Sequence, residues 1–344
     1  MASATSLPSG FVATDWGRAT APPRMPDGAP SRSAQPRAEL PPAREMAKAA
    51  ALIDKAKQVL RAQFDALRDG QPIDLPAIRR LTRDVALSIN RHRHAVIGLT
   101  RLRSSHEYTY IHSIAVSALM IGLARELGLP EEQVAAAGLA GMLHDIGKSK
   151  VPVSVLDKPG PLSSDEWVTI KTHPERGAAI LRRLGEMDPI VLDVALHHHE
   201  RLDGSGYPHA LRADEISIHA RIAAVCDVYD ALTSRRAYKE ARPAAAVLEV
   251  MTRAVGQFDP QVLRALRTLI GAFPAGTLVR LQRGQLAVVI SEVPENPLSP
   301  RVELVGHAVS GRPIEAAICE TAGNPIVAVE RPEDWPHLDL SQSS

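Results

Sequence analysis

The sequence is poor in aromatic residues and in cysteine. Phe, Trp and Tyr make up 3% of its 344 residues, although apolar residues make up 45%. A core of this composition has to be built from Ala, Leu, Val and Ile, and there are enough of these for one large domain and a smaller appendage. The two cysteines, Cys226 and Cys319, are too few for a disulfide framework, which favours a reducing compartment.

The sequence also lacks an excess of charge of either sign. It has 40 basic and 39 acidic residues, a net charge of +1, so we expect no duplex nucleic acid as a partner. The longest apolar run, from Ile114 to Ala124, ends at Arg125 and is too short to span a bilayer. The N-terminus shows no basic-then-apolar signal pattern. These absences predict a cytoplasmic enzyme without a membrane span.

Apolar periodicity divides the chain into parts. An amphipathic helix from about Arg44 to Gly70 and a second from about Pro76 to Leu102 precede closely spaced helical segments, and short β-rich segments follow Phe273. The expected parts are a disordered tail (1–42), an N-terminal helical segment (43–103), a helical domain (104–273), a small β-rich region (274–334) and a frayed terminus (335–344). The N-terminal helices are either a dimerisation or regulatory segment or the first layer of the same bundle.

Local signals mark helix ends within the helical domain. Ser163 and Glu166 form a capping-box pattern, while Pro189 and Pro260 are placed for the first turn of a helix. His173 precedes a proline, which predicts an extended backbone at that position. We therefore expect a mainly α fold, a helical bundle with a small C-terminal β appendage.

Histidine is concentrated in the helical domain, where nine of the 13 histidines fall between His106 and His219. Residues 140–148, Ala-Gly-Met-Leu-His-Asp-Ile-Gly-Lys, place His144 beside Asp145. An isolated pair of this kind would be a buried hydrogen bond, but neighbouring residues can also reach one metal where a helix ends or bends. Gly147 is expected to supply the bend, because glycine tolerates dihedrals that other residues avoid.

Other histidines and aspartates recur on the helical stretches around this pair. The candidate ligands are five histidines and two aspartates: His112, His144, Asp145, His173, His198, His199 and Asp227. A mixed nitrogen and oxygen set without cysteine disfavours structural zinc and favours iron or manganese. Seven ligands fit two divalent ions bridged by Asp145, with a metal-bridging hydroxide as the nucleophile for a phosphodiester.

The order of these segments resembles the HD-GYP family, a branch of the HD metal-dependent phosphohydrolases. The matching segments are 108–112, 143–148, 158–160, 173–177, 198–208 (His-His-Glu-Arg-Leu-Asp-Gly-Ser-Gly-Tyr-Pro) and 221–233. The resemblance implies an HD-type helical bundle in which residues 104–273 are the catalytic domain. It implies hydrolysis of cyclic di-GMP to pGpG, GMP or both, with the seven candidates as metal ligands.

The resemblance also implies catalytic and substrate contacts. Asp145 and Lys148 become catalytic residues, and Lys148, Arg236 and Lys239 would hold phosphate oxygens. From the residues alone, these cations would form a solvated surface. The remaining implied substrate contacts form a loop, which could equally be a plain structural turn: Gly206, Tyr207 and Pro208. In that loop Tyr207 either stacks on a base or packs inward.

Other positions bear on metal number and on the supporting residues. Some family members carry a glutamate one helical turn before the first histidine ligand, where it supports a third metal, but this chain has Tyr108 there, so two metals are expected. Asp203 and Asp230 are candidates to orient histidines. His197 falls outside the matching motif and is not expected to be a ligand.

Two alternative functions stay open. The first is HD chemistry on another cyclic dinucleotide or nucleotide. The second is a signalling scaffold that docks a diguanylate cyclase through the Gly-Tyr-Pro loop, and a homodimer could form through the N-terminal helices. A degenerate ligand set would favour the scaffold, whereas this sequence keeps every expected ligand.

Overall fold

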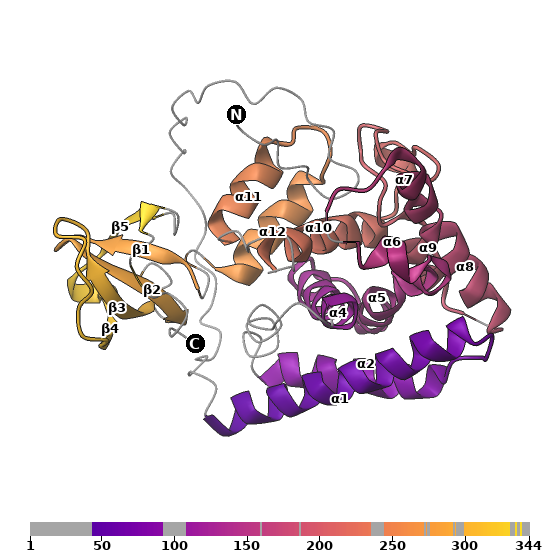
Figure 1. Cartoon of the computed structure of the whole chain (residues 1–344), viewed down its shortest axis with the longest axis horizontal. Helices are drawn as coiled ribbons and strands as arrows, with labels where there is room; N and C mark the ends of the chain where they lie inside the picture. The colour runs from indigo at the N-terminus through magenta and orange to yellow at the C-terminus, as the bar shows by residue number, and fades with distance from the viewer. Residues whose placement is uncertain are drawn as a thin grey trace.

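The computed structural model describes most of the chain. The described residues are 43–91, 108–158, 160–185, 187–234, 244–271, 273, 276–291, 293, 299–330, 334, 335 and 338. The predicted tail (1–42), the predicted end of the second helix near Leu102 and nearly all of the predicted frayed terminus lie outside them. Figure 1 shows a body of helices with a small sheet beside it, which confirms the predicted fold class.

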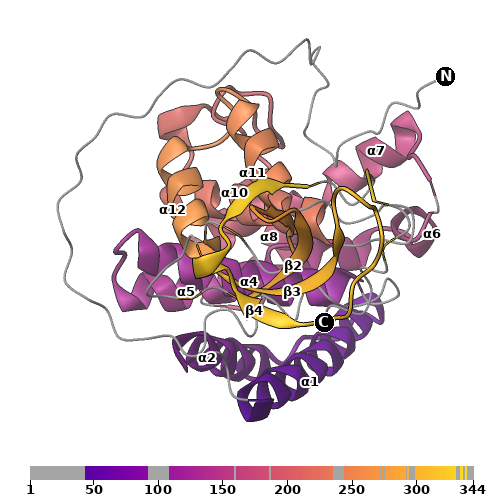
Figure 2. The same cartoon turned by 90° about the vertical axis from the view of Figure 1, so that its left-hand side faces the viewer.

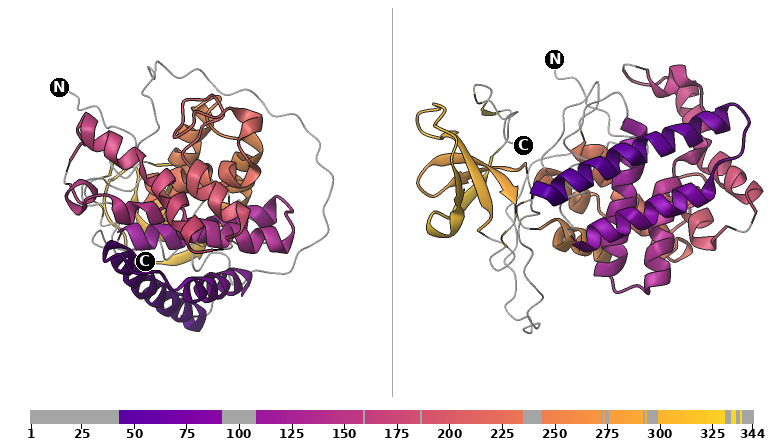
Figure 3. Two further views of the ribbon diagram at one scale, coloured as in Figure 1. Left: turned by 90° about the vertical axis from the view of Figure 1, so that its right-hand side faces the viewer. Right: turned by 90° about the horizontal axis from the view of Figure 1, so that it is seen from below.

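Two N-terminal helices cover one side of the helical body. Helix α1 (Ala43–Arg68) and helix α2 (Leu75–Arg91) lie side by side in Figure 1 and Figure 3, and both pack on α4 (Tyr108–Glu126). Their buried side chains belong to the same apolar cluster as the rest of the helical core. In the structure these helices therefore form an outer layer of the bundle.

The centre of the bundle is built from α4, α5 (Glu131–Leu143) and α10 (Ile218–Thr233). Small residues let α4 and α5 approach closely: a Cβ at Gly141 would lie 2.7 Å from the Cα of Ser117. The Ser117 hydroxyl donates to the Gly138 carbonyl at 2.7 Å, so this buried polar group is satisfied. Close packing of small residues explains how the chain forms a core with few aromatic residues.

Shorter helices surround this centre and carry the loops. They are η2 (Ile146–Lys150), α6 (Val153–Leu156), α7 (Ser164–Lys171), α8 (His173–Arg183), α9 (Pro189–His197), η3 (Ala213–Glu215), α11 (Ala244–Arg253) and α12 (Pro260–Ile270). The capping box of Ser163 and Glu166 is confirmed. The prediction of an extended His173 is wrong: His173 opens α8, because Pro174 occupies the first turn, where a missing N–H is tolerated.

The C-terminal region forms a five-stranded antiparallel sheet of order β4-β3-β2-β1-β5, which Figure 2 shows as strongly curved. Its elements are β1 (Leu278–Leu281), β2 (Gln285–Ser291), β3 (Arg301–His307), β4 (Ile318–Glu320), η4 (Thr321–Gly323) and β5 (Ile326–Val329). Alternating residues bury apolar side chains on both faces, with Val279 in one cluster and Leu278 in the other. The β-rich segments predicted after Phe273 did not include the residues of strand β4.

Among the described residues, no helix is both long enough and apolar enough to cross a membrane.

Candidate metal centre

The structure brings the seven candidate ligands together from five places in the bundle. They come from α4 (His112), the α5–η2 junction (His144, Asp145), the start of α8 (His173), the end of α9 (His198, His199) and α10 (Asp227). Their ligand atoms form two groups, each within 4.8 Å: Asp145, His173, His198 and His199, and His112, His144 and Asp227. All seven residues are buried.

The α5–η2 junction aims two neighbouring side chains at one place. Helix α5 ends at Leu143, and Asp145 has the non-helical angles φ −98° and ψ 9° at the start of η2. The helix therefore ends as predicted, but the interpretation of Gly147 is wrong because its φ is not positive. A Cβ at Gly147 would lie 2.0 Å from the carbonyl oxygen of His173, so glycine is needed for the contact between η2 and α8.

The two carboxylate oxygens of Asp145 face different groups of ligands. Oδ1 lies 3.2 Å from Nε2 of His173 and 3.8 Å from Nε2 of His198. Oδ2 lies 3.3 Å from Nε2 of His144 and 3.8 Å from Nε2 of His112. A carboxylate in this position can give one oxygen to each of two cations.

Four of the histidines are held through Nδ1, which leaves Nε2 toward the centre. His144, His173 and His198 have Nδ1 within 2.8–2.9 Å of a backbone carbonyl, at Gly141, Ile170 and Val194 respectively. Because a carbonyl only accepts, Nδ1 must carry the proton and Nε2 the lone pair. Nδ1 of His112 lies 2.7 Å from Asp230 Oδ2, so the prediction that Asp230 orients a histidine is confirmed.

Unsatisfied polar atoms mark the same place. Nε2 of His144, Oδ1 of Asp145 and Nδ1 of His199 are buried and have no hydrogen-bond partner in the part of the chain that the structure describes. Burying such atoms without a partner costs free energy, and buried polar atoms in folded proteins are nearly all satisfied. A divalent cation accepts lone pairs from all three, so the residues fit a metal.

Electrostatics favour the protonation states that ligands need at most of these positions. Burial, reinforced by neighbouring imidazoles, holds the pKa values of His198 and His199 well below the ordinary value. Burial acts to raise the pKa of Asp145, but Lys148 and His144 outweigh it and leave that pKa well below its usual range. Burial lowers the pKa of His112, but hydrogen bonds to Asp227 and Asp230 outweigh burial and raise it to about 9. A metal at His112 has to displace this proton.

The Gly-Tyr-Pro loop packs directly against the ligands. The ring of Tyr207 stacks on His199 with centroids 4.6 Å apart and an angle of 25°, so this side chain packs inward. A Cβ at Gly206 would lie 2.4 Å from the Glu200 Cα, which explains the glycine. Pro208 follows a cis peptide bond and leads into a segment held by the Glu200 carboxylate.

The other residues predicted to support the site or bind substrate are only partly described by the structure. The Lys148 ammonium lies 2.5 Å from Asp145 Oδ2, at the edge of the site. Arg236 and Lys239 lie outside the described residues. The prediction for Asp203 is wrong, because its carboxylate accepts from Ser205 instead of a histidine.

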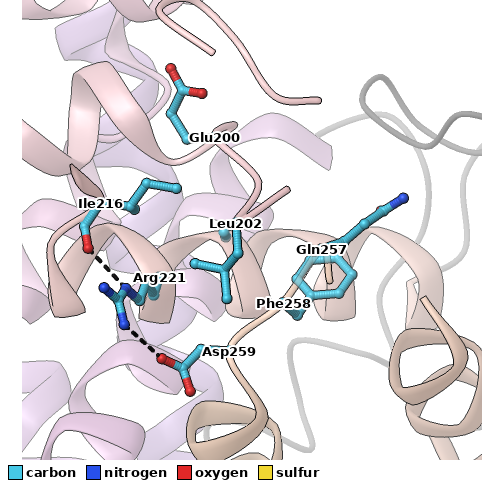
Figure 4. Close-up of a pocket in the computed structure, with 8 residues that line it drawn as sticks. Glu200, Leu202, Ile216, Arg221, Gln257, Phe258 and Asp259 are labelled. Atoms are coloured by element: carbon cyan, nitrogen blue, oxygen red, sulfur yellow. Dashed lines mark hydrogen bonds and ion pairs between the residues drawn. The ribbon is translucent and has the colours of Figure 1, made fainter. Parts of the chain in front are cut away.

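The sequence analysis assigned no role to Arg221. This residue of α10 contacts the segment just before α10 and the start of α12. Its Nε donates to the Ile216 carbonyl at 2.8 Å and its Nη1 to Asp259 Oδ2 at 3.1 Å, as Figure 4 shows. Asp259 in turn caps α12. The pocket beside Arg221 has a volume of about 10 Å³, which is too small for more than a water. Arg221 begins segment 221–233, which resembles the family, and this position was the sequence feature that could have pointed to it.

The chain is similar to known proteins over most of its length. A family model for the HD domain matches residues 85–262. The chain is 44% identical over 302 residues to the cyclic di-GMP phosphodiesterase PA4108 of Pseudomonas aeruginosa, covering 87% of this chain and 73% of that protein. It is 39% identical over 158 residues to the 3'3'-cGAMP-specific phosphodiesterase 1 of Vibrio cholerae, covering 45% of this chain and 36% of that protein.

A solved structure supports the fold. The HD-GYP-like protein Bd1817 of Bdellovibrio bacteriovorus aligns with a TM-score of 0.53 at 19% identity, covering 65% of this chain and 72% of that chain. Both histidine and aspartate clusters lie within the residues that match the HD domain. The chain belongs to the HD-GYP family of cyclic di-GMP phosphodiesterases within the HD superfamily.

Proposed function

We propose that this chain is a metal-dependent phosphodiesterase that hydrolyses cyclic di-GMP to pGpG, GMP or both. The observation that carries the proposal is Asp145, whose two oxygens face two separate groups of buried ligands. The similarity to PA4108, which extends over 87% of this chain, supports the substrate.

Two divalent ions, iron or manganese, are the cofactors that we propose. Nitrogen and oxygen donors without thiolate are typical of these metals and unlike a structural zinc site. The ligands would be His112, His144 and Asp227 for one ion and His173, His198 and His199 for the other, with Asp145 shared. When bound, such a pair activates water at neutral pH and stabilises charge on the attacking and leaving oxygens.

The protein's own residues position this chemistry. Asp230 fixes the imidazole of His112, and backbone carbonyls fix the imidazoles of His144, His173 and His198. Lys148, whose ammonium lies beside Asp145, is proposed to hold a phosphate oxygen of the substrate.

Further substrate contacts are proposed from the family resemblance. Arg236 and Lys239 would clamp a second phosphate group, and the loop of Gly206, Tyr207 and Pro208 would form one wall of the site. Tyr207 would act mainly by supporting His199, because its ring is buried against that imidazole.

Cyclic di-GMP is favoured over the alternatives. The chain is 44% identical to PA4108 over 302 residues, and 39% identical to the 3'3'-cGAMP-specific enzyme over 158 residues. A scaffold that only docks a diguanylate cyclase would not need two sets of buried ligands. Docking of such a cyclase at the Gly-Tyr-Pro loop, and pairing of two chains through α1 and α2, are additional proposals compatible with catalysis.

The proposal is tested by a hydrolysis assay on the purified chain with added iron(II) or manganese(II). Cyclic di-GMP, 3'3'-cGAMP and pGpG are offered separately and the products are identified by chromatography. We expect metal-dependent hydrolysis that is fastest with cyclic di-GMP, and no activity in chelator. Faster hydrolysis of 3'3'-cGAMP would contradict the substrate, and hydrolysis in chelator would contradict the mechanism.

A further inference from the structure

A second pair of histidines lies beside the metal centre but belongs to neither ligand group. Nε2 of His197, the last residue of α9, lies 3.2 Å from Nδ1 of His209, and their ring centroids are 5.3 Å apart. His209 directly follows the Gly-Tyr-Pro loop. The pair therefore links the helix that ends at the ligands His198 and His199 to the loop that covers them.

The imidazole of His197 is oriented as a metal ligand is. Its Nδ1 lies 2.7 Å from Oδ1 of Asp193, one helical turn earlier, and the other oxygen of Asp193 accepts from the Ser217 hydroxyl. A carboxylate accepts the Nδ1 proton, so the lone pair of His197 is on Nε2 and faces His209. A carboxylate behind an imidazole is the arrangement that fixes the tautomer and raises the basicity of metal-bound histidines.

The backbone of His209 is also fixed before any ion binds. Its N–H donates to the buried carboxylate of Glu200 at 2.7 Å, and Glu200 accepts from the Leu211 N–H at 3.0 Å as well. The side chain of His209 is exposed, and that of His197 is 18% exposed. Both nitrogens can therefore be reached from solvent, unlike the buried centre.

We propose that His197 and His209 form an outer cation site, separate from the catalytic pair, that takes a borderline divalent cation such as Zn²⁺. Two nitrogens 3.2 Å apart can both lie about 2.0–2.1 Å from one ion, with roughly 100° between the two bonds. Two neutral imidazoles without a directly coordinating carboxylate favour Zn²⁺, Ni²⁺ or Cu²⁺ over Mn²⁺. Water molecules would complete the coordination.

The bound ion would tether the Gly-Tyr-Pro loop to the end of α9. One ligand lies next to His198, and the other lies next to Pro208. Zn²⁺ at this site would hold the loop closed over the centre, so it would act on loop movement and leave the catalytic ligands unchanged.

The test is a Zn²⁺ titration of the purified chain in excess Mn²⁺, comparing wild type with His209→Ala. Exchange at the catalytic centre is common to both proteins and cancels in the difference. We expect wild type to bind one more Zn²⁺ per chain than His209→Ala, and to gain a Zn²⁺-dependent rise in melting temperature that the variant lacks. His307→Ala, a change of the same kind in β3, is the matched control and should keep the full Zn²⁺ count.

A second variant distinguishes a preorganised site from two unrelated surface histidines. Asp193→Asn keeps both imidazoles but weakens the acceptor behind His197, so Zn²⁺ binding should weaken about ten- to a hundredfold. Equal Zn²⁺ counts in wild type and His209→Ala would mean that the two rings only share a hydrogen bond, and the proposal would be wrong. An equal loss in His307→Ala would likewise contradict it, because the binding would then be non-specific.

Discussion

Nδ1 of His112 on α4 lies 2.7 Å from Oδ2 of Asp230 on α10, while Nε2 of the same ring lies 3.1 Å from Asp227 Oδ1. Asp227 and Asp230 are three residues apart, so one face of α10 supplies both a candidate ligand and the group that orients another. The second oxygen of Asp230 accepts from the Ser234 hydroxyl at 3.2 Å. Among the described residues, the side chain of Asp230 contacts the ligand set through His112.

Asp230→Asn is predicted to weaken metal binding without unfolding the protein. The amide keeps the shape of the side chain but is a weaker acceptor for the His112 Nδ1 proton, so the metal affinity should fall about ten- to a hundredfold. Metal titration measures the affinity, and circular dichroism shows whether the variant stays folded. Ser234→Ala removes the hydrogen bond to the second carboxylate oxygen of Asp230 and should change the affinity much less. Similar losses in the two variants would show that Asp230 merely supports the fold.

Asp145→Ala is predicted to abolish hydrolysis. The change removes the oxygens that face both ligand groups, so activity should fall by more than the roughly hundredfold that loss of an orienting residue produces. The metal content of the folded variant should fall at the same time. Activity close to wild type in a folded, metal-loaded Asp145→Ala protein would exclude Asp145 as the shared ligand.

Gly147→Ala is predicted to damage the centre through the backbone alone. The added methyl group would lie 2.0 Å from the His173 carbonyl oxygen and 2.6 Å from the Gly177 nitrogen, so η2 has to move away from α8. Overpacking of this kind destabilises by about 1–3 kcal/mol, and the shift should also displace Asp145. Thermal melts and metal titration are the measurements. Gly323→Ala meets no atom within 4 Å and should be nearly neutral.

Local signals in the sequence predicted the helix ends well. The capping box of Ser163 and the first-turn positions of Pro189 and Pro260 are confirmed, because such signals depend on residues only a few positions apart. Strand β4 was missed because its three residues pair only with β3 and have no alternating apolar pattern of their own. The backbone of His173 was predicted to be extended, but Pro174 lies in the first turn of α8 and His173 is helical.

The residues of the candidate site also differ in how well the sequence predicts them. The ligand set was predicted from the histidines and aspartates that recur on the helical segments and from the order of family motifs, and the structure brings those residues together. The role of Gly147 could not be predicted, since it depends on a backbone 26 residues away in α8. Asp203 was misassigned for a local reason, because its carboxylate accepts from Ser205 two residues later. Arg221 was overlooked because its partner Asp259 lies 38 residues away.

The N-terminal helix α1 contacts the segment that follows Asp145. The Lys150 ammonium, at the end of η2, donates to the carbonyl of Leu67 in the last turn of α1. The carbonyl of Lys150 accepts from Arg176 Nη1 of α8 at 2.5 Å. Helix η2 is therefore held between α1 and α8, and a positive charge at the end of α1 is favourable for the helix dipole.

Lys150→Met is predicted to weaken metal binding several-fold and to lower stability by about 1 kcal/mol, since it removes one net hydrogen bond but keeps an apolar stem. Lys150→Arg should restore much of both, because it can still donate to Leu67. Lys158→Met is the matched control: Lys158 pairs with Glu166 at 2.7 Å at the start of α7, so metal affinity should not change. Calorimetric metal titration and thermal melts distinguish the effects. A lower melting temperature with wild-type metal affinity would mean that α1 stabilises the bundle without positioning Asp145.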